Sequence, residues 1–165
     1  MRVVVMGIGK SGLAAVRHFR RQGVTVAVSE VTPAERLDQG LVAALRRDGI
    51  ELEAGGHTAA FLARADRIVV SPGVPLDEPA LAAARAQGIP VAGELAVAAP
   101  LVTAPLVAVT GTNGKTTTCT LLGGLLAAAG QEVFVGGNIG TPLLEHVDGP
   151  RQAQVIVCEV SSFQL

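Results

Sequence analysis

The stretch that decides the fold of this chain reads Leu106-Val107-Ala108-Val109-Thr110-Gly111-Thr112-Asn113-Gly114-Lys115-Thr116-Thr117. Its four leading apolar residues predict a buried strand, and the glycine-rich loop behind them opens a predicted helix over residues 116–129. The apolar face of that helix is predicted from the leucines at helical spacing, which are Leu121, Leu122, Leu125 and Leu126. Strand, tight loop and helix in this order are typical of α/β folds with a parallel sheet.

The chain opens with a second stretch of the same kind. Val3-Val4-Val5-Met6 predicts a strand, and Gly7-Ile8-Gly9-Lys10-Ser11-Gly12 follows it as a glycine-rich turn. A helix is predicted next, ending near Gly23, and Val24–Val28 predicts the following strand. Such a βαβ unit favours neighbouring parallel strands.

Alternating strands and helices continue along the rest of the sequence. Strands are predicted at Ile50–Glu53, Ile68–Val70, Ile89–Ala92, Val133–Val135 and Val155–Val160. We therefore predict a Rossmann-like domain with a parallel sheet over residues 1–93, a short helix and linker over 94–105, and the start of a P-loop α/β ATPase domain over 106–165. Three strands and one long helix do not cover both faces of a sheet, so we expect this second domain to be truncated.

The loop from Gly111 to Thr117 has the composition of a phosphate-binding site. Glycines let the backbone bend around a phosphate, and the helix N-terminus directs N–H groups at the anion. Lys115 is expected to reach the β- and γ-phosphates of ATP, and the Thr116 hydroxyl is expected to ligate Mg²⁺. The predicted ATP-binding residues are Gly111, Thr112, Asn113, Gly114, Lys115, Thr116 and Thr117.

This loop departs from the usual pattern G-x-x-x-x-G-K-[ST], because Val109 occupies the first glycine position. The alternative interpretation is a tight turn with an incidental lysine. The chain contains only two lysines, Lys10 and Lys115, and both lie in glycine-rich turns, which favours the phosphate-binding interpretation.

An acidic residue, Glu159, stands at the end of the predicted strand Val155–Val160. Downstream of a phosphate-binding loop, a carboxylate in this position is suited to holding Mg²⁺ directly or through water. A solvated strand-end carboxylate is the alternative for this residue taken alone. Together with the loop, we favour a metal site made by Thr116 and Glu159, with Lys115 as their catalytic partner.

The first turn has the dinucleotide-type spacing Gly7-x-Gly9-x-x-Gly12. Glu30 lies 18 residues after Gly12, where a ribose hydroxyl could be bound. The spacing alone does not separate NAD from another nucleotide diphosphate, and a purely structural turn is also open. Because the domain is about half of a six-stranded dinucleotide fold, we favour a single nucleotide diphosphate.

Composition excludes several classes of function. The net charge of −1, with charged residues at 16%, gives no nucleic-acid footprint, and four Phe without Tyr or Trp give no stacking platform. No run approaches the roughly 20 apolar residues of a membrane span. We expect a cytoplasmic protein in which Cys119 and Cys158 are buried free thiols.

The histidines are predicted to have structural roles only. His18 is expected to be solvent-exposed on the first helix, His57 to cap a short helix, and His146 to lie in a loop.

Three segments together resemble the Mur ligases, which build the peptide stem of the bacterial cell wall. They are Gly111–Thr117, Gly136-Gly137-Asn138-Ile139-Gly140 and Glu159-Val160-Ser161-Ser162-Phe163-Gln164-Leu165. The Gly7–Gly12 turn, Ser71-Pro72-Gly73 and the ending most resemble the branch of the family that adds D-glutamate. The resemblance spans essentially the whole chain.

The resemblance implies an ATP- and Mg²⁺-dependent ligase of peptidoglycan precursor synthesis, with UDP-N-acetylmuramoyl-L-alanine and D-glutamate as substrates. It implies substrate contacts from Gly9, Lys10, Ser11, Gly73, Asn138 and Gln164. It also implies that ATP converts the substrate carboxylate to an acyl phosphate, which the amine then attacks. The family's C-terminal domain and carbamylated lysine would lie beyond Leu165, so we expect this chain alone to be inactive. We also expect a monomer.

Three other functions remain open at this point. Another Mur ligase would share the ATP loop, an NAD-dependent oxidoreductase would use only the first turn, and a nucleotide-binding module would lack catalysis. Binding of UDP rather than NADH would separate the first class from the second.

Overall fold

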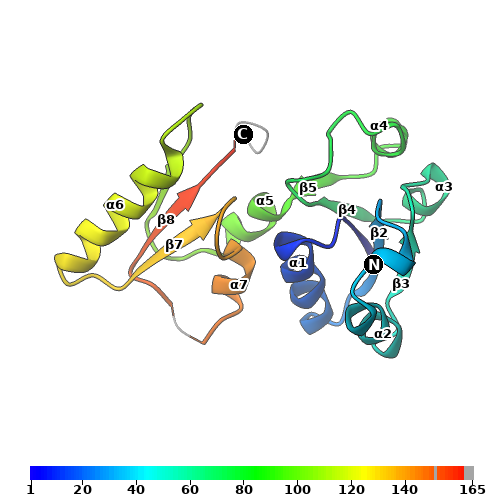
Figure 1. Ribbon diagram of the computed structural model, residues 1–165, viewed down its shortest axis with the longest axis horizontal. Coiled ribbons are helices and arrows are strands. Elements are labelled where there is room, and N and C mark those ends of the chain that lie inside the picture. The colour runs from blue at the N-terminus through cyan, green and yellow to red at the C-terminus, as the bar shows by residue number, and fades with distance from the viewer. Residues whose placement is uncertain (151, 162–165) are drawn as a thin grey trace. The chain divides into compact units, whose positions relative to one another are not determined.

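The computed structural model describes residues 1–150 and 152–161. Their contacts divide the chain into two compact units, Met1–Gly93 and Glu94–Leu165. Both units combine parallel sheets with helices, as predicted (Figure 1). Among the described residues, no helix is both long and apolar enough to cross a membrane.

The first unit is a five-stranded parallel sheet in the order β3-β2-β1-β4-β5. Its elements are β1 (Arg2–Met6), α1 (Lys10–Arg21), β2 (Thr25–Glu30), the 3-10 helix η1 (Ala34–Arg36), α2 (Gln39–Arg47), β3 (Glu51–Ala54), α3 (Ala59–Leu62), β4 (Arg67–Val70), α4 (Pro79–Ala86) and β5 (Val91–Gly93). Helices α1 and α2 cover one face of the sheet, and α3 and α4 cover the other (Figure 1).

The β-branched run at the start of the chain explains why β1 lies at the centre of this sheet. Val3, Val4, Val5 and Met6 are completely buried, since helices cover both faces of β1. One face contributes Val4 and Met6 to a cluster with Leu62, Ile68 and Leu81. The strand order changes direction between β1 and β4, and in open α/β sheets ligands bind beside such a switch point.

The second unit is a three-stranded parallel sheet in the order β6-β8-β7. Its elements are α5 (Glu94–Ala98), the 3-10 helix η2 (Ala99–Leu101), β6 (Leu106–Val109), α6 (Lys115–Ala128), β7 (Val133–Gly137), α7 (Leu143–Val147) and β8 (Val155–Glu159). Helix α6 packs on one face, and α7, packed against α5, lies on the other (Figure 1). The short helix predicted at the start of residues 94–105 is α5, in which Glu94 and Ala98 are buried.

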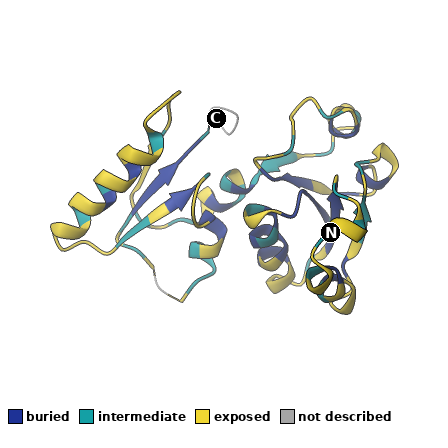
Figure 2. Ribbon diagram, in the orientation of Figure 1, coloured by how far each residue is buried: buried dark blue, intermediate teal, exposed yellow. Residues whose placement is uncertain are grey.

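Two details of the second unit correct the sequence prediction. Strand β6 was predicted to be buried, but it is an edge strand, and Leu106 and Val107 are 38% and 40% exposed. Leu121 and Leu125 of α6 are 63% and 69% exposed, so they do not form the buried face of that helix. Figure 2 shows α6 exposed along most of its length, whereas β8 is buried.

The face of α6 that meets the sheet is made by small residues. Cys119 and Gly123 are its buried positions. A Cβ atom at position 123 would lie 2.3 Å from Cγ2 of Val135, so the helix backbone approaches β7 as closely as glycine permits. The prediction placed the leucines on the buried face because residues 121–128 of α6 are apolar on every side, and periodicity alone does not reveal which side is covered.

The predicted surroundings of all three histidines were wrong. His18 is 4% exposed and meets Phe19 edge to face, His57 precedes the α3 cap rather than forming it, and His146 belongs to α7, where it stacks on Phe134. The cap of α3 is Thr58, whose hydroxyl accepts from the Phe61 N–H.

The prediction for the cysteines is confirmed. Cys119 and Cys158 are both buried and free. Burial raises the pKa of the Cys158 thiol to about 12, and it also raises the pKa of Cys119, with Glu159 adding to both shifts. Both side chains therefore stay protonated thiols at neutral pH.

Candidate functional site

The loop between β6 and α6 is an exposed turn that ends on a left-handed glycine. Gly111 has φ +147° and Gly114 has φ +78°, and Gly114 is the N-cap of α6. These backbone angles strongly favour glycine, which explains the two residues at these positions. All five residues from 110 to 114 are exposed, so this turn is open to solvent.

Lys115 is the first residue of α6, and its side chain folds back over the loop. Its Nζ donates to the carbonyl oxygen of Gly111 at 2.7 Å and lies 3.5 Å from that of Thr112. The ammonium group therefore lies against the loop backbone. An anion cradled by the loop would meet this positive charge together with the N–H groups at the start of α6.

Thr116 and Glu159 meet beside this loop. The Thr116 hydroxyl donates to Glu159 Oε2 at 2.8 Å, and Glu159 is only 3% exposed. The second carboxylate oxygen, Oε1, is buried and has no hydrogen-bond partner among the described residues. A buried carboxylate oxygen without a partner is costly, so this atom is suited to a cation.

The donor atoms at this point fit Mg²⁺. A carboxylate oxygen and a hydroxyl are the hard oxygen ligands that Mg²⁺ prefers. Within the described part of the chain, no group of three or more His, Cys, Asp or Glu side chains could hold a metal. The remaining ligands would be phosphate oxygens and water, as is usual for a nucleotide-bound Mg²⁺.

The carboxyl ends of the three strands bring the predicted residues of this unit together. The Asn138 N–H, just after β7, donates to the Glu159 carbonyl at 2.9 Å. The Val160 N–H, just after β8, donates to the Val109 carbonyl at the end of β6, also at 2.9 Å. Asn138, Glu159 and the loop thus share one edge of the sheet, whereas Gln164 lies outside the described residues.

The first glycine-rich turn is packed much more tightly. A Cβ atom at position 12 would lie 1.9 Å from the Gly7 carbonyl oxygen, so only glycine fits there. The Ser71 hydroxyl donates to the same carbonyl at 2.7 Å, which joins the turn to the end of β4. Gly9, Lys10 and Gly73 are exposed, and Ser11 is half-buried.

Glu30 is bound to the backbone of this turn. Its two carboxylate oxygens accept from the N–H groups of Ile8 and Thr32, each at 2.9 Å. Burial of Glu30 works against the charged form, but these two N–H groups, together with His57, hold the carboxyl pKa below its usual value. Glu30 therefore supports the turn, and its contact with a ribose hydroxyl stays a prediction.

Three polar side chains that the sequence analysis did not connect lie close to Glu30. Ser29 of β2 is fully buried, and its Oγ lies 2.6 Å from Glu53 Oε2 and 2.7 Å from His57 Nδ1. Ser29 and Glu53 are register neighbours in the parallel pair β2–β3. Polar residues at the carboxyl ends of two adjacent strands were the signal that could have identified this cluster.

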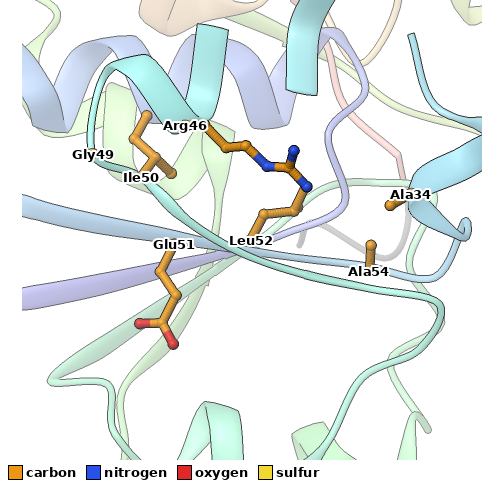
Figure 3. A pocket seen from close by; sticks show the side chains of 7 residues that line it. All are labelled: Ala34, Arg46, Gly49, Ile50, Glu51, Leu52 and Ala54. Carbon is orange, nitrogen blue, oxygen red and sulfur yellow. The ribbon is translucent and has the colours of Figure 1, made fainter. Parts of the chain in front are cut away.

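A separate pocket lies on the outer part of the first unit. It encloses about 530 Å³ and is lined by residues of α2, β3 and their surroundings, namely Ala34, Arg46, Gly49, Ile50, Glu51, Leu52 and Ala54 (Figure 3). Neither glycine-rich turn contributes to it. In Figure 3 the Arg46 and Glu51 side chains extend to different sides of β3, and Glu51 forms ion pairs with Arg2 and Arg64.

Comparison with known families agrees with both halves of this description. Residues 1–93 match the family described as "Mur ligase MurD-like, N-terminal domain", and residues 109–165 match "Mur ligase middle domain". The chain belongs to the Mur ligase family.

Curated relatives indicate one branch of that family. The chain is 52% identical over 164 residues to the UDP-N-acetylmuramoylalanine--D-glutamate ligase of Desulfosudis oleivorans, covering 99% of this chain and 36% of the relative. It is 49% identical to the protein of the same name from Acidobacterium capsulatum, covering 99% and 35%. The chain thus spans about a third of the length of these relatives.

Solved structures show the same fold. A pseudomurein peptide ligase type C from Methanothermus fervidus superposes with a TM-score of 0.53 at 26% identity, covering 99% of this chain and 33% of that one. The UDP-N-acetylmuramate-alanine ligase MurC from Thermotoga maritima gives a TM-score of 0.52 at 24% identity, covering 98% and 37%.

Proposed function

We propose that this chain is the UDP-substrate-binding and ATP-binding part of a ligase that adds D-glutamate to UDP-N-acetylmuramoyl-L-alanine. The names of the curated relatives support the choice of substrates. The observation that carries the proposal is the group formed by Lys115, Thr116 and Glu159 at the glycine-rich loop. It combines a cation for phosphate, a hydroxyl and a buried carboxylate with one unpartnered oxygen.

In this proposal the loop binds the phosphates of ATP. The backbone from Gly111 to Thr117 would wrap the β- and γ-phosphates, and the Lys115 ammonium would exchange its contact with the Gly111 carbonyl for phosphate oxygens. Glu159 Oε1 and Thr116 Oγ1 would hold Mg²⁺. When bound there, Mg²⁺ would offset the negative charge of the phosphate oxygens.

The chemistry joins a carboxylate to an amine. The carboxylate oxygen of UDP-N-acetylmuramoyl-L-alanine attacks the γ-phosphorus of ATP, giving an acyl phosphate and ADP. The D-glutamate nitrogen then attacks the carbonyl carbon, an amide forms, and inorganic phosphate leaves with one proton released from nitrogen. Lys115 stabilises the negative charge on the phosphoryl group during its transfer, and Thr116 and Glu159 fix that group's position.

The nucleotide end of the UDP substrate is assigned to the first unit. Gly9, Lys10, Ser11 and Gly73 lie at the turns that follow β1 and β4, on either side of the switch point in strand order. Asn138 is assigned to the substrate beside Glu159, and Gln164 is assigned to it from the sequence resemblance. A cytoplasmic monomer completes the proposal.

Binding to this chain tests the proposal directly. Calorimetric titration is expected to show binding of UDP and of UDP-N-acetylmuramoyl-L-alanine, and no comparable binding of NADH. ATP is expected to bind only with Mg²⁺, and Glu159→Gln should weaken the Mg²⁺ requirement. Tight binding of NADH without binding of UDP would refute the assignment.

A further inference from the structure

A chain of hydrogen bonds runs from Glu53 through Ser29 to His57 at the carboxyl end of the first sheet. The Ser29 hydroxyl donates to Glu53 Oε2 at 2.6 Å, and its oxygen lies 2.7 Å from His57 Nδ1. The Glu53 carboxylate also accepts from the hydroxyl and the N–H of Thr58. Residues from β2, β3 and the loop before α3 therefore form one polar network.

The number of hydrogens in this network decides which nitrogen of His57 carries a proton. A serine hydroxyl has a single hydrogen, and here it points to Glu53. The short contact between Ser29 Oγ and Nδ1 then requires that Nδ1 carries the hydrogen and donates it. In the neutral ring, Nε2 is therefore the nitrogen with a lone pair.

The other ring nitrogen of His57, Nε2, takes no part in this network. Within residues 1–150 and 152–161, no hydrogen bond to Nε2 is found, and the His57 residue is only partly buried. The network places His57 near the ligand end of the sheet, because Glu30, which interacts electrostatically with His57, accepts from the Ile8 N–H inside the first glycine-rich turn.

Anchoring of the loop does not account for this arrangement. The N–H groups of Gly55 and Gly56 already donate to the Glu30 carbonyl, and Thr58 is already tied to Glu53. The loop is thus closed on both sides of His57 without the imidazole. A buried serine that orients a partly exposed ring is the arrangement used where a histidine has to present one particular nitrogen to a ligand.

We propose that His57 is a specificity-determining residue of the nucleotide site in the first unit, with Nε2 accepting a hydrogen bond from the nucleoside part of the ligand. Ser29 and Glu53 are positioning residues that act through His57. The donor is a ribose hydroxyl or the N3–H of a uracil-type base, which share the chemistry of a single neutral donor. This inference rests on the proposed binding of a UDP ligand.

The test is calorimetric titration of this 165-residue chain with UDP and with inorganic pyrophosphate. His57→Ala and His57→Asn are each expected to weaken UDP binding about tenfold, the effect of one lost hydrogen bond, and to leave pyrophosphate binding unchanged. His57→Gln is expected to recover most of the affinity, because the end of a glutamine side chain reaches the place of Nε2. His146→Gln, in the second unit, is the control and should bind UDP like the wild type.

The network itself is tested at Ser29 by nitrogen NMR. In the wild type, the His57 ring is expected to be protonated at Nδ1 and its Nε2 signal to shift on addition of UDP. Ser29→Ala should lose the preference for Nδ1 and weaken UDP binding by a similar factor. Loss of affinity for N3-methyl-UDP would identify the base as the donor, and loss for 2′-deoxy- or 3′-deoxy-UDP would identify the ribose.

The outcomes separate the two proposals. If the wild type binds neither UDP nor pyrophosphate, the proposed function fails and this inference fails with it. If the wild type binds UDP and all three His57 variants bind it equally well, the inference alone is overturned. The inference is also overturned if the His57 variants lose affinity for UDP and for pyrophosphate to the same extent. It is overturned as well if His57→Gln binds UDP as weakly as His57→Ala and both variants have lower thermal stability, because His57 would then have a structural role.

Discussion

The two units of this chain begin with the same local structure and use it differently. In the first, the turn after β1 is closed on itself, since Gly12 packs on the Gly7 carbonyl and Glu30 takes the Ile8 N–H. In the second, the turn after β6 is open, and Lys115, one of the two lysines in the sequence, lies against its backbone. A strand, a glycine-rich turn and a helix therefore define a backbone shape, whereas the neighbouring side chains decide whether the turn is closed or open.

The same contrast extends to packing. Strand β1 is covered on both faces, whereas β6 and the outer side of α6 expose Leu106, Val107, Leu121 and Leu125. The first unit thus has a closed core, and the second has an apolar surface without a partner among the described residues. The experiments below test this contrast between the units, beginning with the largest expected effect.

Removing the charge at the open turn should have the largest consequence. In a ligase of the relatives' full length that carries this sequence, Lys115→Ala is expected to slow ADP release by a thousandfold or more, because one stabilising contact to the transferred phosphoryl group is lost. A coupled assay of ADP release at saturating substrates measures this.

The matched control is Lys10→Ala at the closed turn. It should raise the KM for the UDP substrate and leave the rate at saturation nearly unchanged, because Lys10 is assigned to substrate binding. Equal losses of kcat in the two variants would mean that the turns do not differ in the way we describe.

Adding a methyl group to the closed turn should unfold the first unit or come near to doing so. Gly12→Ala places a Cβ atom 1.9 Å from backbone, and we expect a loss of about 3 kcal/mol or more in the free energy of unfolding. Gly9→Ala meets nothing within 4 Å and should be tolerated. Urea unfolding of both variants measures the difference, and a stable Gly12→Ala protein would show that the turn is looser than described.

The second unit is expected to have a pH-dependent stability that comes from Glu94. This residue is 1% exposed, its Oε1 accepts from the Leu144 N–H at 2.6 Å, and burial raises its pKa from 4.5 to about 7. Because the folded state holds the proton more tightly than the unfolded state, stability should fall as pH rises from about 4.5 to about 7, by at most about 3 kcal/mol.

Glu94→Gln should remove this pH dependence and keep an acceptor for the Leu144 N–H. Thermal unfolding of the wild type and the variant at pH 5 and pH 8 is the measurement, with Glu35→Gln, which changes an exposed carboxyl, as the control. If the wild type were more stable at pH 8 than at pH 5, and Glu94→Gln showed the same difference, Glu94 would not be the source of the pH dependence.

The smallest effect is expected on the outer side of α6. Leu125 is 69% exposed, so Leu125→Gln should change the free energy of unfolding by less than about 0.5 kcal/mol. Leu144 is completely buried in the same unit, so Leu144→Ala should lower the free energy of unfolding by about 2–5 kcal/mol. Denaturant unfolding compares them, and a large cost for Leu125→Gln would show that something covers this side of α6.

The sequence was sufficient for the fold class and for the order of strand, glycine-rich turn and helix at the start of each unit. β-branched runs and glycine-rich turns predict β1, β6 and the loops after them, since these signals are local. Burial was not predictable in the same way. His18 lies among arginines in the sequence but is covered by the fold, and Leu121 and Leu125 belong to an apolar helix of which only one side meets the sheet.

Polar networks were the other part that the sequence did not reveal. Ser29, Glu53 and His57 are separated along the chain, and the register of β2 and β3 brings the first two together. The binding of Glu30 to the first turn likewise depends on where β2 ends relative to β1. Such contacts depend on strand register, which periodicity predicts only to within a residue or two.

The close approach of α6 to β7 limits where the second unit can adjust. With Gly123 pressed against Val135, α6 cannot slide or turn on the sheet until that valine side chain moves. A displacement at the N-terminus of α6 must therefore be taken up by the preceding loop. In that loop, Gly111 and Gly114 are the glycines with positive φ, where the backbone has conformations that other residues rarely adopt. Conformational response to a bound triphosphate should accordingly be confined to residues 110–114, with the helix behind them remaining stationary.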